Sequence, residues 1–235
     1  MFDFISGEIL LFDKEENWSS FDVIAYIKPA VLDFEEKKRG IRQKIKIGHA
    51  GTLDPLATGL LVVCTGKKTK QIDQIQRLRK IYTGSFYLGA TTPSYDRELP
   101  VNNQYPIDHI TEDLILNTAQ QFIGKQMQVP PVYSAISVGG KRSYELARQN
   151  IELELSPKLI EIYRFEIIKI ELPYVYFEIE CSKGTYIRAI ARDFGKALNS
   201  GSYLNALRRT KIGDYDVKDA LTVRQFVDIL KKAKV

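Results

Sequence analysis

The feature that most constrains the fold is a glycine-bounded loop that leads directly into an apolar segment. The loop reads Gly48-His49-Ala50-Gly51-Thr52-Leu53-Asp54-Pro55-Leu56-Ala57-Thr58-Gly59. Its three glycines indicate close backbone approach or positive φ angles, and Pro55 fixes the backbone directly after the carboxylate. The apolar run over residues 60–64 predicts a buried strand. We therefore expect a stiff loop that holds Asp54 against the core, where scaffolds tend to place reactive groups.

Two interpretations of Asp54 compete. An Asp-Pro pair in a glycine-rich loop is a common turn signal, in which the carboxylate only hydrogen-bonds its own backbone. The other interpretation is a reactive carboxylate. It is favoured by His49 in the same loop and by the basic segments on both sides of the loop.

Positive charge is concentrated around this loop. Residues 37–48 contain six basic side chains and no acid, and residues 67–80 contain six more against Asp73, although the whole chain carries only +5. One basic run is usually a solvated surface. Two runs that bracket one candidate site instead indicate a polyanion whose phosphates contact Lys and Arg. Nucleic acid is the natural candidate.

Composition limits the other classes. With 235 residues the chain can form one large domain or two small ones. No apolar run approaches the roughly 18 residues of a membrane span, and the first residues lack the basic segment of a signal peptide, so we expect a soluble cytoplasmic protein. Cys64 and Cys181 have no CxxC companions, and only His49 and His109 are histidines. A disulfide framework and a nitrogen- or sulfur-ligated metal are therefore not expected; this count does not address a carboxylate magnesium site.

Periodicity and capping residues predict the elements. Strands are expected over residues 7–13, 60–64, 81–89, 159–172 and 174–181, with short strands within 203–216. Helices are expected from Ser19 or Ser20 to about Phe34 with a kink or break at Pro29, over 111–122, from about 185, and from 222. Strands and helices do not alternate regularly, so we expect one α+β domain over residues 1–235. Its central sheet would be mixed and mostly antiparallel, flanked by helices and loops.

A second group of polar residues lies where a strand is expected to end and a helix to begin. Residues 181–188 read Cys-Ser-Lys-Gly-Thr-Tyr-Ile-Arg. Arg188 could pair with a surface acid. Alternatively it meets Asp54 and stabilises that carboxylate as a nucleophile, with Tyr186 standing over the reacting group.

Together these segments resemble the TruB-type tRNA pseudouridine synthases. The loop G-H-A-G-T-L-D-P-L-A-T-G is the specific part, because other pseudouridine synthase families share the Asp but neither the preceding Gly-His nor the following Pro. Further matches follow in family order over nearly the whole chain: Lys80-Ile81-Tyr82, Tyr133-Ser134-Ala135, residues 181–188, and Leu207-Arg208-Arg209.

The resemblance implies the pseudouridine synthase fold and isomerisation of uridine-55 in the T-loop of tRNA, without a cofactor or metal. The catalytic residues would be Asp54, Tyr186 and Arg188, and Tyr186 would take or relay a ribose proton in the glycal version of the mechanism. Tyr82 would stack on the base, His49 would enter the space left by the flipped uridine, and the substrate site would also include Leu207, Gly51, Thr52 and Lys80. Residues expected at the RNA backbone are Lys44, Lys46, Lys67, Lys68, Lys141, Arg142 and Arg208. Residues 129–157 would form a protruding thumb that closes over the RNA loop.

Three departures from the family pattern limit how far the family's residue roles carry over to this chain. Lys14-Glu15-Glu16-Asn17 stands where Lys-Pro-x-Gly is common, and Pro93 stands where an acid is usual. The end at Val235 leaves no room for a C-terminal PUA-type RNA-binding domain, so tRNA affinity would rest on the basic segments and the thumb. We expect a monomer that binds the tRNA T-arm without a guide RNA, since the guide-dependent relatives rely on an appended C-terminal domain.

Two other functions explain less of the sequence. An RNA-binding or tRNA-folding protein with vestigial activity would fit the basic segments, but it would not need Asp54, Tyr82, Tyr186 and Arg188 together. An aspartyl phosphotransferase needs a second acid two residues after the first, and Leu56 occupies that place.

Overall fold

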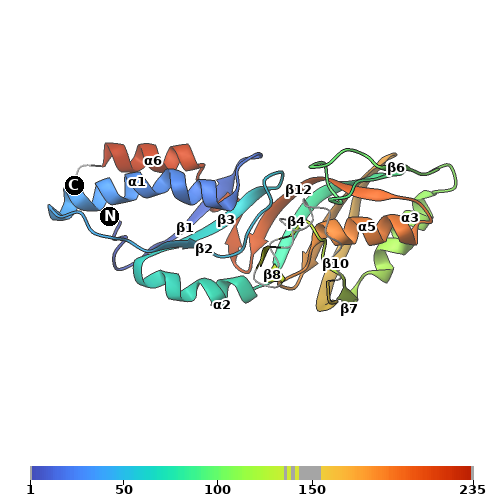
Figure 1. Cartoon of the computed structure of the whole chain (residues 1–235), viewed down its shortest axis with the longest axis horizontal. Helices are drawn as coiled ribbons and strands as arrows, with labels where there is room; N and C mark the ends of the chain where they lie inside the picture. Colours follow the sequence, from blue (N-terminus) through green and yellow to red (C-terminus); the bar gives the residue numbers. More distant parts are fainter. Residues whose placement is uncertain (1, 135–136, 139–140, 143–154, 234–235) are drawn as a thin grey trace. The chain divides into compact units, whose positions relative to one another are not determined.

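The computed structural model describes residues 2–134, 137–138, 141–142 and 155–233 (Figure 1). Its strands are β1 (Ile9–Lys14), β2 (Ile47–His49), β3 (Thr58–Thr65), β4 (Lys80–Leu88), β5 (Ala90–Thr91), β6 (Asn103–Gln104), β7 (Gly124–Gln128), β8 (Ser137–Val138), β9 (Lys141–Arg142), β10 (Lys158–Glu171), β11 (Tyr174–Cys181), β12 (Ser202–Ile212) and β13 (Tyr215–Asp216). The α-helices are α1 (Ser20–Arg39), α2 (Ile72–Arg77), α3 (Glu112–Gln121), α5 (Ile187–Ala197) and α6 (Val223–Lys232), and short 3₁₀ segments cover Gly66–Gln71 and Val217–Asp219.

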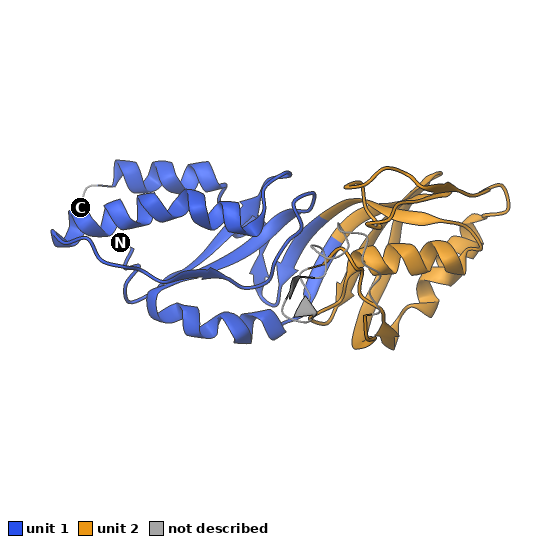
Figure 2. Ribbon diagram, in the orientation of Figure 1, with its two compact units in different colours: residues 1–82, 208–235 blue, residues 83–207 orange. Residues whose placement is uncertain are grey.

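Most strands belong to one sheet with the order β1-β3-β12-β4-β11-β10-β7. The pairs β1–β3, β2–β3, β10–β11, β7–β10 and β12–β13 are antiparallel, whereas β12 runs parallel to β3. The expected α+β domain with a mixed, mostly antiparallel sheet is therefore confirmed. Within it the chain forms two compact units (Figure 2): unit 1 comprises Met1–Tyr82 and Arg208–Val235, and unit 2 comprises Thr83–Leu207.

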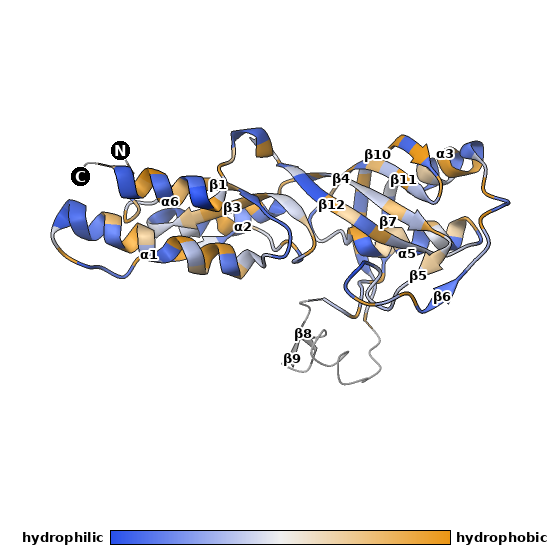
Figure 3. Ribbon diagram, turned by 90° about the horizontal axis from the view of Figure 1, so that it is seen from above, coloured by the Kyte–Doolittle hydropathy of each residue, from blue (hydrophilic) through white to orange (hydrophobic). Residues whose placement is uncertain are grey.

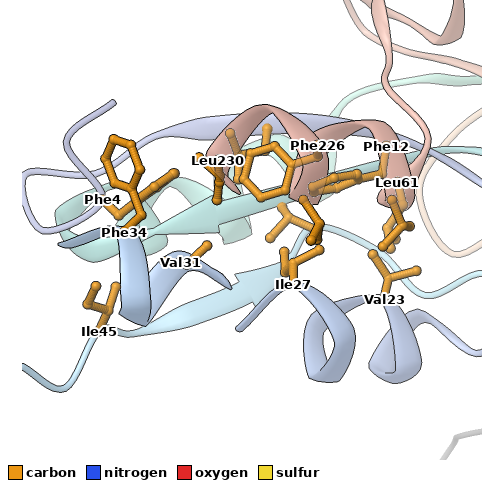
Figure 4. Packing of buried hydrophobic residues seen from close by; sticks show 14 residues of the cluster. Phe4, Phe12, Val23, Ile27, Val31, Phe34, Ile45, Leu61, Phe226 and Leu230 are labelled. Carbon is orange, nitrogen blue, oxygen red and sulfur yellow. The ribbon is translucent and has the colours of Figure 1, made fainter. Parts of the chain in front are cut away.

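Unit 1 is organised around strand β3, which is buried on both faces. Successive side chains of a strand point to opposite faces, so Leu61 and Val63 join one apolar cluster while Leu60, Val62 and Cys64 join another. The first cluster contains residues of β1, α1 and α6 (Figure 4), and the second contains Ile75 of α2. Burial on both sides explains why the sequence here is a continuous apolar run.

Helix α1 begins as expected and ends later than expected. Ser19 caps it in a capping box with Asp22. The predicted end near Phe34 is wrong, because the helix passes through Pro29 and continues to Arg39. Val31, Phe34 and Glu35 are buried on the same face as the residues before the proline, so packing offsets the hydrogen bond that Pro29 removes. In Figure 3, α1 and α6 both carry apolar and polar residues, as amphipathic helices do.

The core of unit 2 is aromatic. Rings from β4, β10, β11, α5 and the end of α3 lie with centroids 4.3–6.2 Å apart. The rings belong to Phe86, Phe122, Phe165, Phe177 and Phe194. In β11, Val175, Phe177, Ile179 and Cys181 alternate onto the buried face. Thr111 caps α3 and Thr222 caps α6, also as expected.

Two elements differ from those expected, and the thumb is described only in part. The short strands expected within residues 203–216 are one eleven-residue strand, β12, followed by the two-residue β13. Residues 72–77 form helix α2, which the charge-rich sequence had not suggested. Of the thumb expected over 129–157, only 129–134, the antiparallel pair β8–β9 and 155–157 are described; the other residues of that range lie outside the described residues. Among the described residues, no helix is long and apolar enough to cross a membrane.

Candidate active site

The Asp54 loop joins two strands that pair with each other. Strand β2 runs antiparallel to β3, with His49 opposite Val63, and the Ala50 amide donates to the Val62 carbonyl at 2.8 Å. The chain therefore leaves β2 and returns to β3 through a closed loop; the sequence predicted the loop and the strand after it, but not β2. Asp54 lies half-buried within this loop.

Hydrogen bonds fix the loop backbone immediately around Asp54. The Ser20 hydroxyl accepts from the Leu53 amide at 2.9 Å and donates to the Leu53 carbonyl at 3.2 Å. The Pro55 carbonyl accepts from the Asn17 amide at 2.8 Å, and the Asp54 carbonyl accepts from the Ala57 amide at 3.0 Å. The loop is thus tied to the β1–α1 connection on both sides of the carboxylate, which preorganises it.

The two glycines nearest the carboxylate have the backbone conformations that the sequence predicted. Gly51 has φ +103° and Gly59 has φ +98°, in the region that side chains rarely adopt. A Cβ on Gly59 would lie 2.3 Å from the Arg209 carbonyl oxygen, because β3 and β12 pair at this point. Gly48 lacks a positive φ, and a Cβ there would meet the Ile72 side chain at 2.9 Å.

Lys14 lies under the loop as a fully buried cation. Its Nζ donates to the carbonyls of Glu15 at 2.9 Å, Trp18 at 2.6 Å and Pro55 at 3.2 Å. Burial lowers the pKa of Lys14 to about 8, although the negative charge of Asp54 acts in the opposite direction. From the sequence, Lys14 was noted only in a departure from the family pattern. Its position at the end of the predicted first strand was the available signal.

His49, at the end of β2, is held neutral. Burial lowers its pKa from the ordinary value, and the positive charge of Arg209 lowers it further. Its Nδ1 is buried and has no hydrogen-bond partner among the described residues. A neutral, partly buried imidazole is compatible with the proposed contact with RNA bases, which are themselves uncharged.

Tyr82 and Lys80 both lie on β4 and both are buried. The Lys80 ammonium donates to the carbonyls of Gln76 and Leu78, where α2 leads into β4. These contacts tie Lys80 to the backbone next to its own strand, and its role toward a substrate stays a prediction.

Two of the expected catalytic residues, Tyr186 and Arg188, lie in unit 2. Tyr186 is the N-cap residue of α5. Buried Gln128 holds its backbone from both sides: Gln128 Oε1 accepts from the Tyr186 amide at 2.9 Å, and Gln128 Nε2 donates to the Tyr186 carbonyl at 3.1 Å. Leu207 lies half-buried on β12. Gln128 was not predicted as a site residue, because no local sequence pattern connects it to the start of α5, 58 positions away.

Arg188 is buried in the first turn of α5. It donates to the carbonyls of Ser94 at 3.2 Å and Tyr133 at 2.8 Å, and its Nε lies 3.6 Å from Asp96 Oδ2. The acid that Arg188 contacts thus lies three positions after Pro93. The expected pair between Arg188 and Asp54 would join the two units and stays a prediction.

The basic residues expected at RNA differ in their surroundings. Lys44, Lys46 and Lys67 are exposed, and the Gly66 amide donates to the Lys46 carbonyl at 2.9 Å, so the two basic segments meet in unit 1. Lys68 is half-exposed. Arg208 forms a bidentate ion pair with the Asp13 carboxylate, with hydrogen bonds of 2.7 and 2.9 Å. The side chains of Lys141 and Arg142 lie outside the described residues.

Part of the first basic segment is engaged within unit 1. Arg39 pairs with Asp3 and Glu35, and Arg42 pairs with Asp33 and Glu36. In the described ranges, no three His, Cys, Asp or Glu side chains come together as a metal site. Cys64 and Cys181 are buried free thiols.

The chain is similar to known proteins over nearly its whole length. Residues 38–187 match the family model described as TruB family pseudouridylate synthase, N-terminal domain. A protein of Flavobacterium johnsoniae named tRNA pseudouridine synthase B is 51% identical, over 97% of this chain and 98% of its own. One of the same name from Phocaeicola vulgatus is 46% identical, over 99% of this chain and 97% of its own.

Solved structures show the same fold. A chain in the crystal structure of a Cbf5-Nop10-Gar1 complex aligns with a TM-score of 0.68 and 26% identity, over 96% of this chain and 54% of that one. A chain in the structure of an H/ACA RNP bound to a substrate RNA containing 2'-deoxyuridine aligns with a TM-score of 0.67 and 25% identity, over 96% of this chain and 53% of that one. This chain therefore spans about half the length of each. Because the family model spans most of the chain and the curated relatives align over almost their full lengths, the chain belongs to the TruB family of pseudouridylate synthases.

Proposed function

We propose that this protein converts uridine-55 in the T-loop of tRNA into pseudouridine, with Asp54 as the nucleophile. The family makes it a pseudouridine synthase, and relatives of nearly equal length are named tRNA pseudouridine synthase B. The observation that carries the residue assignment is the Asp54 loop. Its carboxylate is half-buried on a backbone that hydrogen bonds hold at Leu53 and Pro55. Such fixed placement is what positioning a reactant requires.

The proposed reaction rearranges one nucleoside without adding or removing atoms. The bond between uracil N1 and ribose C1′ breaks, the uracil turns, and a bond from C5 to C1′ forms, while C5 loses a proton and N1 gains one. Asp54 supplies the nucleophile for this exchange. Tyr186 and Arg188 complete the proposed catalytic group from helix α5.

The uridine must leave its stack before it can react, which costs a few kcal/mol. Stacking of the base on Tyr82 offsets part of that cost. Neutral His49 would occupy the space that the base leaves, where burying a charged imidazole would be costly. Gly51, Thr52, Lys80 and Leu207 would form the rest of the substrate site.

The proposed RNA contact starts from the basic side chains near the Asp54 loop. Lys44, Lys46 and Lys67 are exposed, and the segments that carry them are hydrogen-bonded to each other. Phosphates of the tRNA T-arm would bind there. We propose that the protein acts in the cytoplasm as a monomer, without a guide RNA, and that residues 129–157 close over the RNA loop.

Replacing Asp54 tests the assignment. In Asp54→Asn we expect pseudouridine formation to fall below detection, because the amide is a poor nucleophile, while tRNA binding is retained. The measurement is tritium release from tRNA that carries C5-labelled uridine, since breaking the C5–H bond accompanies the reaction. Asp214→Asn is the matched control, because Asp214 is exposed in a turn of the same unit. Turnover by Asp54→Asn would contradict the proposal.

A second candidate function is an RNA-binding or tRNA-folding protein with vestigial activity, which the basic segments favour. Its tRNA binding would be unaffected in Asp54→Asn, but the unaltered protein would release no tritium. A bare T-arm stem-loop without any other RNA also separates this protein from guide-dependent enzymes. Tritium release from that stem-loop supports a guide-independent isomerase.

A further inference from the structure

Arg209 is a buried arginine that the proposed reaction leaves without a role. It lies on β12 and is 1% exposed. Its Nε donates to the Leu60 carbonyl at 2.8 Å, and its Nη2 donates to the Gly51 carbonyl at 3.0 Å. A longer contact of 3.5 Å joins its Nη1 to the Thr52 carbonyl. Backbone oxygens are the hydrogen-bond partners of this guanidinium among the described residues.

These three carbonyls lie on both sides of Asp54. Gly51 and Thr52 precede the carboxylate, whereas Leu60 follows it on β3. The Arg209 backbone is also paired with Gly59, at the point where a Cβ would collide. One residue therefore bridges the start and the end of the Asp54 loop with its side chain, and contacts the end with its backbone as well.

Placing a guanidinium here is costly, which argues that the bridge serves more than packing. A buried charge loses its hydration, and replacing a buried charged group by an apolar one of similar volume is often neutral or stabilising. Three different nitrogens of this guanidinium each contact a different carbonyl, an arrangement that the fixed fork of arginine donors provides. The neighbouring Arg208 differs: it pairs with Asp13 and is part-exposed, so only one arginine of this pair bridges the loop.

We propose that Arg209 is a positioning residue for the isomerisation, whose guanidinium holds the backbone on both sides of Asp54 so that the carboxylate is presented in one place. This inference rests on the proposed role of Asp54. Arg209 does not touch the reacting atoms. It acts through the loop, and its cation also contributes to the low pKa of His49.

Two substitutions separate geometry from charge. Arg209→Lys keeps the charge but replaces three separate donor nitrogens by one, whereas Arg209→Met removes both the charge and the donors. We expect the single-turnover rate at saturating tRNA to fall about 10- to 100-fold in both, since small misplacements of a reacting group have effects of that size. The Kd for tRNA should stay unchanged. Arg164→Lys, on strand β10 with Glu166 and Glu178 as partners, is the control and should keep the rate.

Histidine NMR supplies a readout that does not depend on activity. The chain has two histidines, so the imidazole resonances of His49 can be followed beside those of His109 as an internal reference. Loss of the cation in Arg209→Met should raise the pKa of His49, whereas Arg209→Lys should leave it near the wild-type value. Faster hydrogen exchange at the Leu53 and Ala57 amides in folded Arg209→Lys would show directly that the loop has loosened.

The outcomes are distinct. A folded Arg209→Lys protein with the wild-type rate and wild-type amide exchange overturns the inference, as does a loss of rate fully explained by weaker tRNA binding. If Arg209→Met does not fold, Arg209→Lys decides alone. Turnover by Asp54→Asn would remove the proposed nucleophile whatever Arg209 does. An inactive Asp54→Asn with a fully active Arg209→Lys would remove only the positioning role.

Discussion

At the scale of single residues, backbone carbonyls stabilise both Lys14 and Arg209, which are buried cations. Lys14 and Arg209 are each surrounded by three backbone carbonyls, including those of Pro55, Gly51 and Leu60 on the Asp54 loop and β3. Carbonyl dipoles replace part of the hydration that burial removes. The cations are thereby fixed to the same short stretch of backbone that carries the carboxylate.

The lowered pKa of His49 has a measurable effect on stability. The folded protein binds fewer protons at this site than the unfolded chain, where histidine titrates near 6.5. The contribution of His49 to the free energy of unfolding is therefore fully present above about pH 6.5 and is lost as the pH falls below that value. We expect the free energy of unfolding, measured with urea, to decrease more between pH 7.5 and 5.5 in the wild type than in His49→Gln.

Both proteins contain the same carboxylates, so the difference between the two decreases reports on the imidazole. An equal decrease in the two proteins would mean that His49 is as easily protonated when folded as when unfolded. Binding of tRNA offers an independent check, because a protonated His49 could not enter the base stack without an added desolvation cost.

Sequence alone reached some of these residues and not others. Asp54, His49 and their glycines stand in one short motif, so local pattern was enough to group them. For Arg188 the sequence left two partners open, a surface acid or Asp54, and the structure adds buried Asp96. Asp96 also forms a bridge with Leu204, and such pairing between distant segments leaves no periodic signal in the sequence.

At the scale of elements, the close approach of β3 and β12 makes Gly59 irreplaceable by a larger residue. Gly59→Ala would place a methyl group 2.3 Å from the Arg209 carbonyl oxygen in addition to straining a positive φ. Strain and overpacking each typically cost about 1–3 kcal/mol. We expect urea denaturation to show a loss of at least about 2 kcal/mol in the free energy of unfolding.

Gly40→Ala is the matched control for this prediction. Gly40 also has a positive φ, +71°, but nothing lies within 4 Å of the position of a Cβ there. Its loss should be about 1 kcal/mol, the cost of the backbone conformation alone. Equal losses in the two variants would mean that β3 and β12 separate easily to accept a methyl group.

Element prediction succeeded where one local cause dominates and failed where packing between distant segments decides. The caps at Ser19, Thr111 and Thr222 were found because each side chain bonds an amide in its own first turn. The end of α1 was misplaced because burial of Phe34 and Glu35 outweighs the effect of Pro29. Strand β12 was divided because its residues are polar on the exposed side and its pairing with β3 is not local.

At the scale of the whole molecule, charge should govern the affinity for RNA. Each phosphate neutralised by Lys or Arg releases counterions, so the Kd for tRNA should rise steeply with salt. We expect the combined substitution of Lys44, Lys46 and Lys67 by Gln to reduce the slope of log K against log salt by about one for each phosphate contact removed. Filter binding over a range of salt concentrations measures it.

A triple substitution of Lys169, Lys196 and Lys218 by Gln changes the net charge equally but leaves the two basic segments intact. Its slope should match that of the wild type. The same slope in all three proteins would show that the two basic segments do not contact phosphates, and a wild-type affinity independent of salt would contradict the electrostatic account altogether.

The division of the chain into units has a consequence for synthesis. Unit 2 is one uninterrupted segment, whereas unit 1 needs Arg208–Val235 to complete a structure begun by Met1–Tyr82. Domains fold as their residues emerge from the ribosome. Unit 2 therefore has all its residues before unit 1 receives Phe226 for its core or Arg209 for its loop. Arg209 reaches the Asp54 loop only after all residues of unit 2 have been made, so a ribosome-bound intermediate can hold a finished aromatic core while the loop still lacks this bridge.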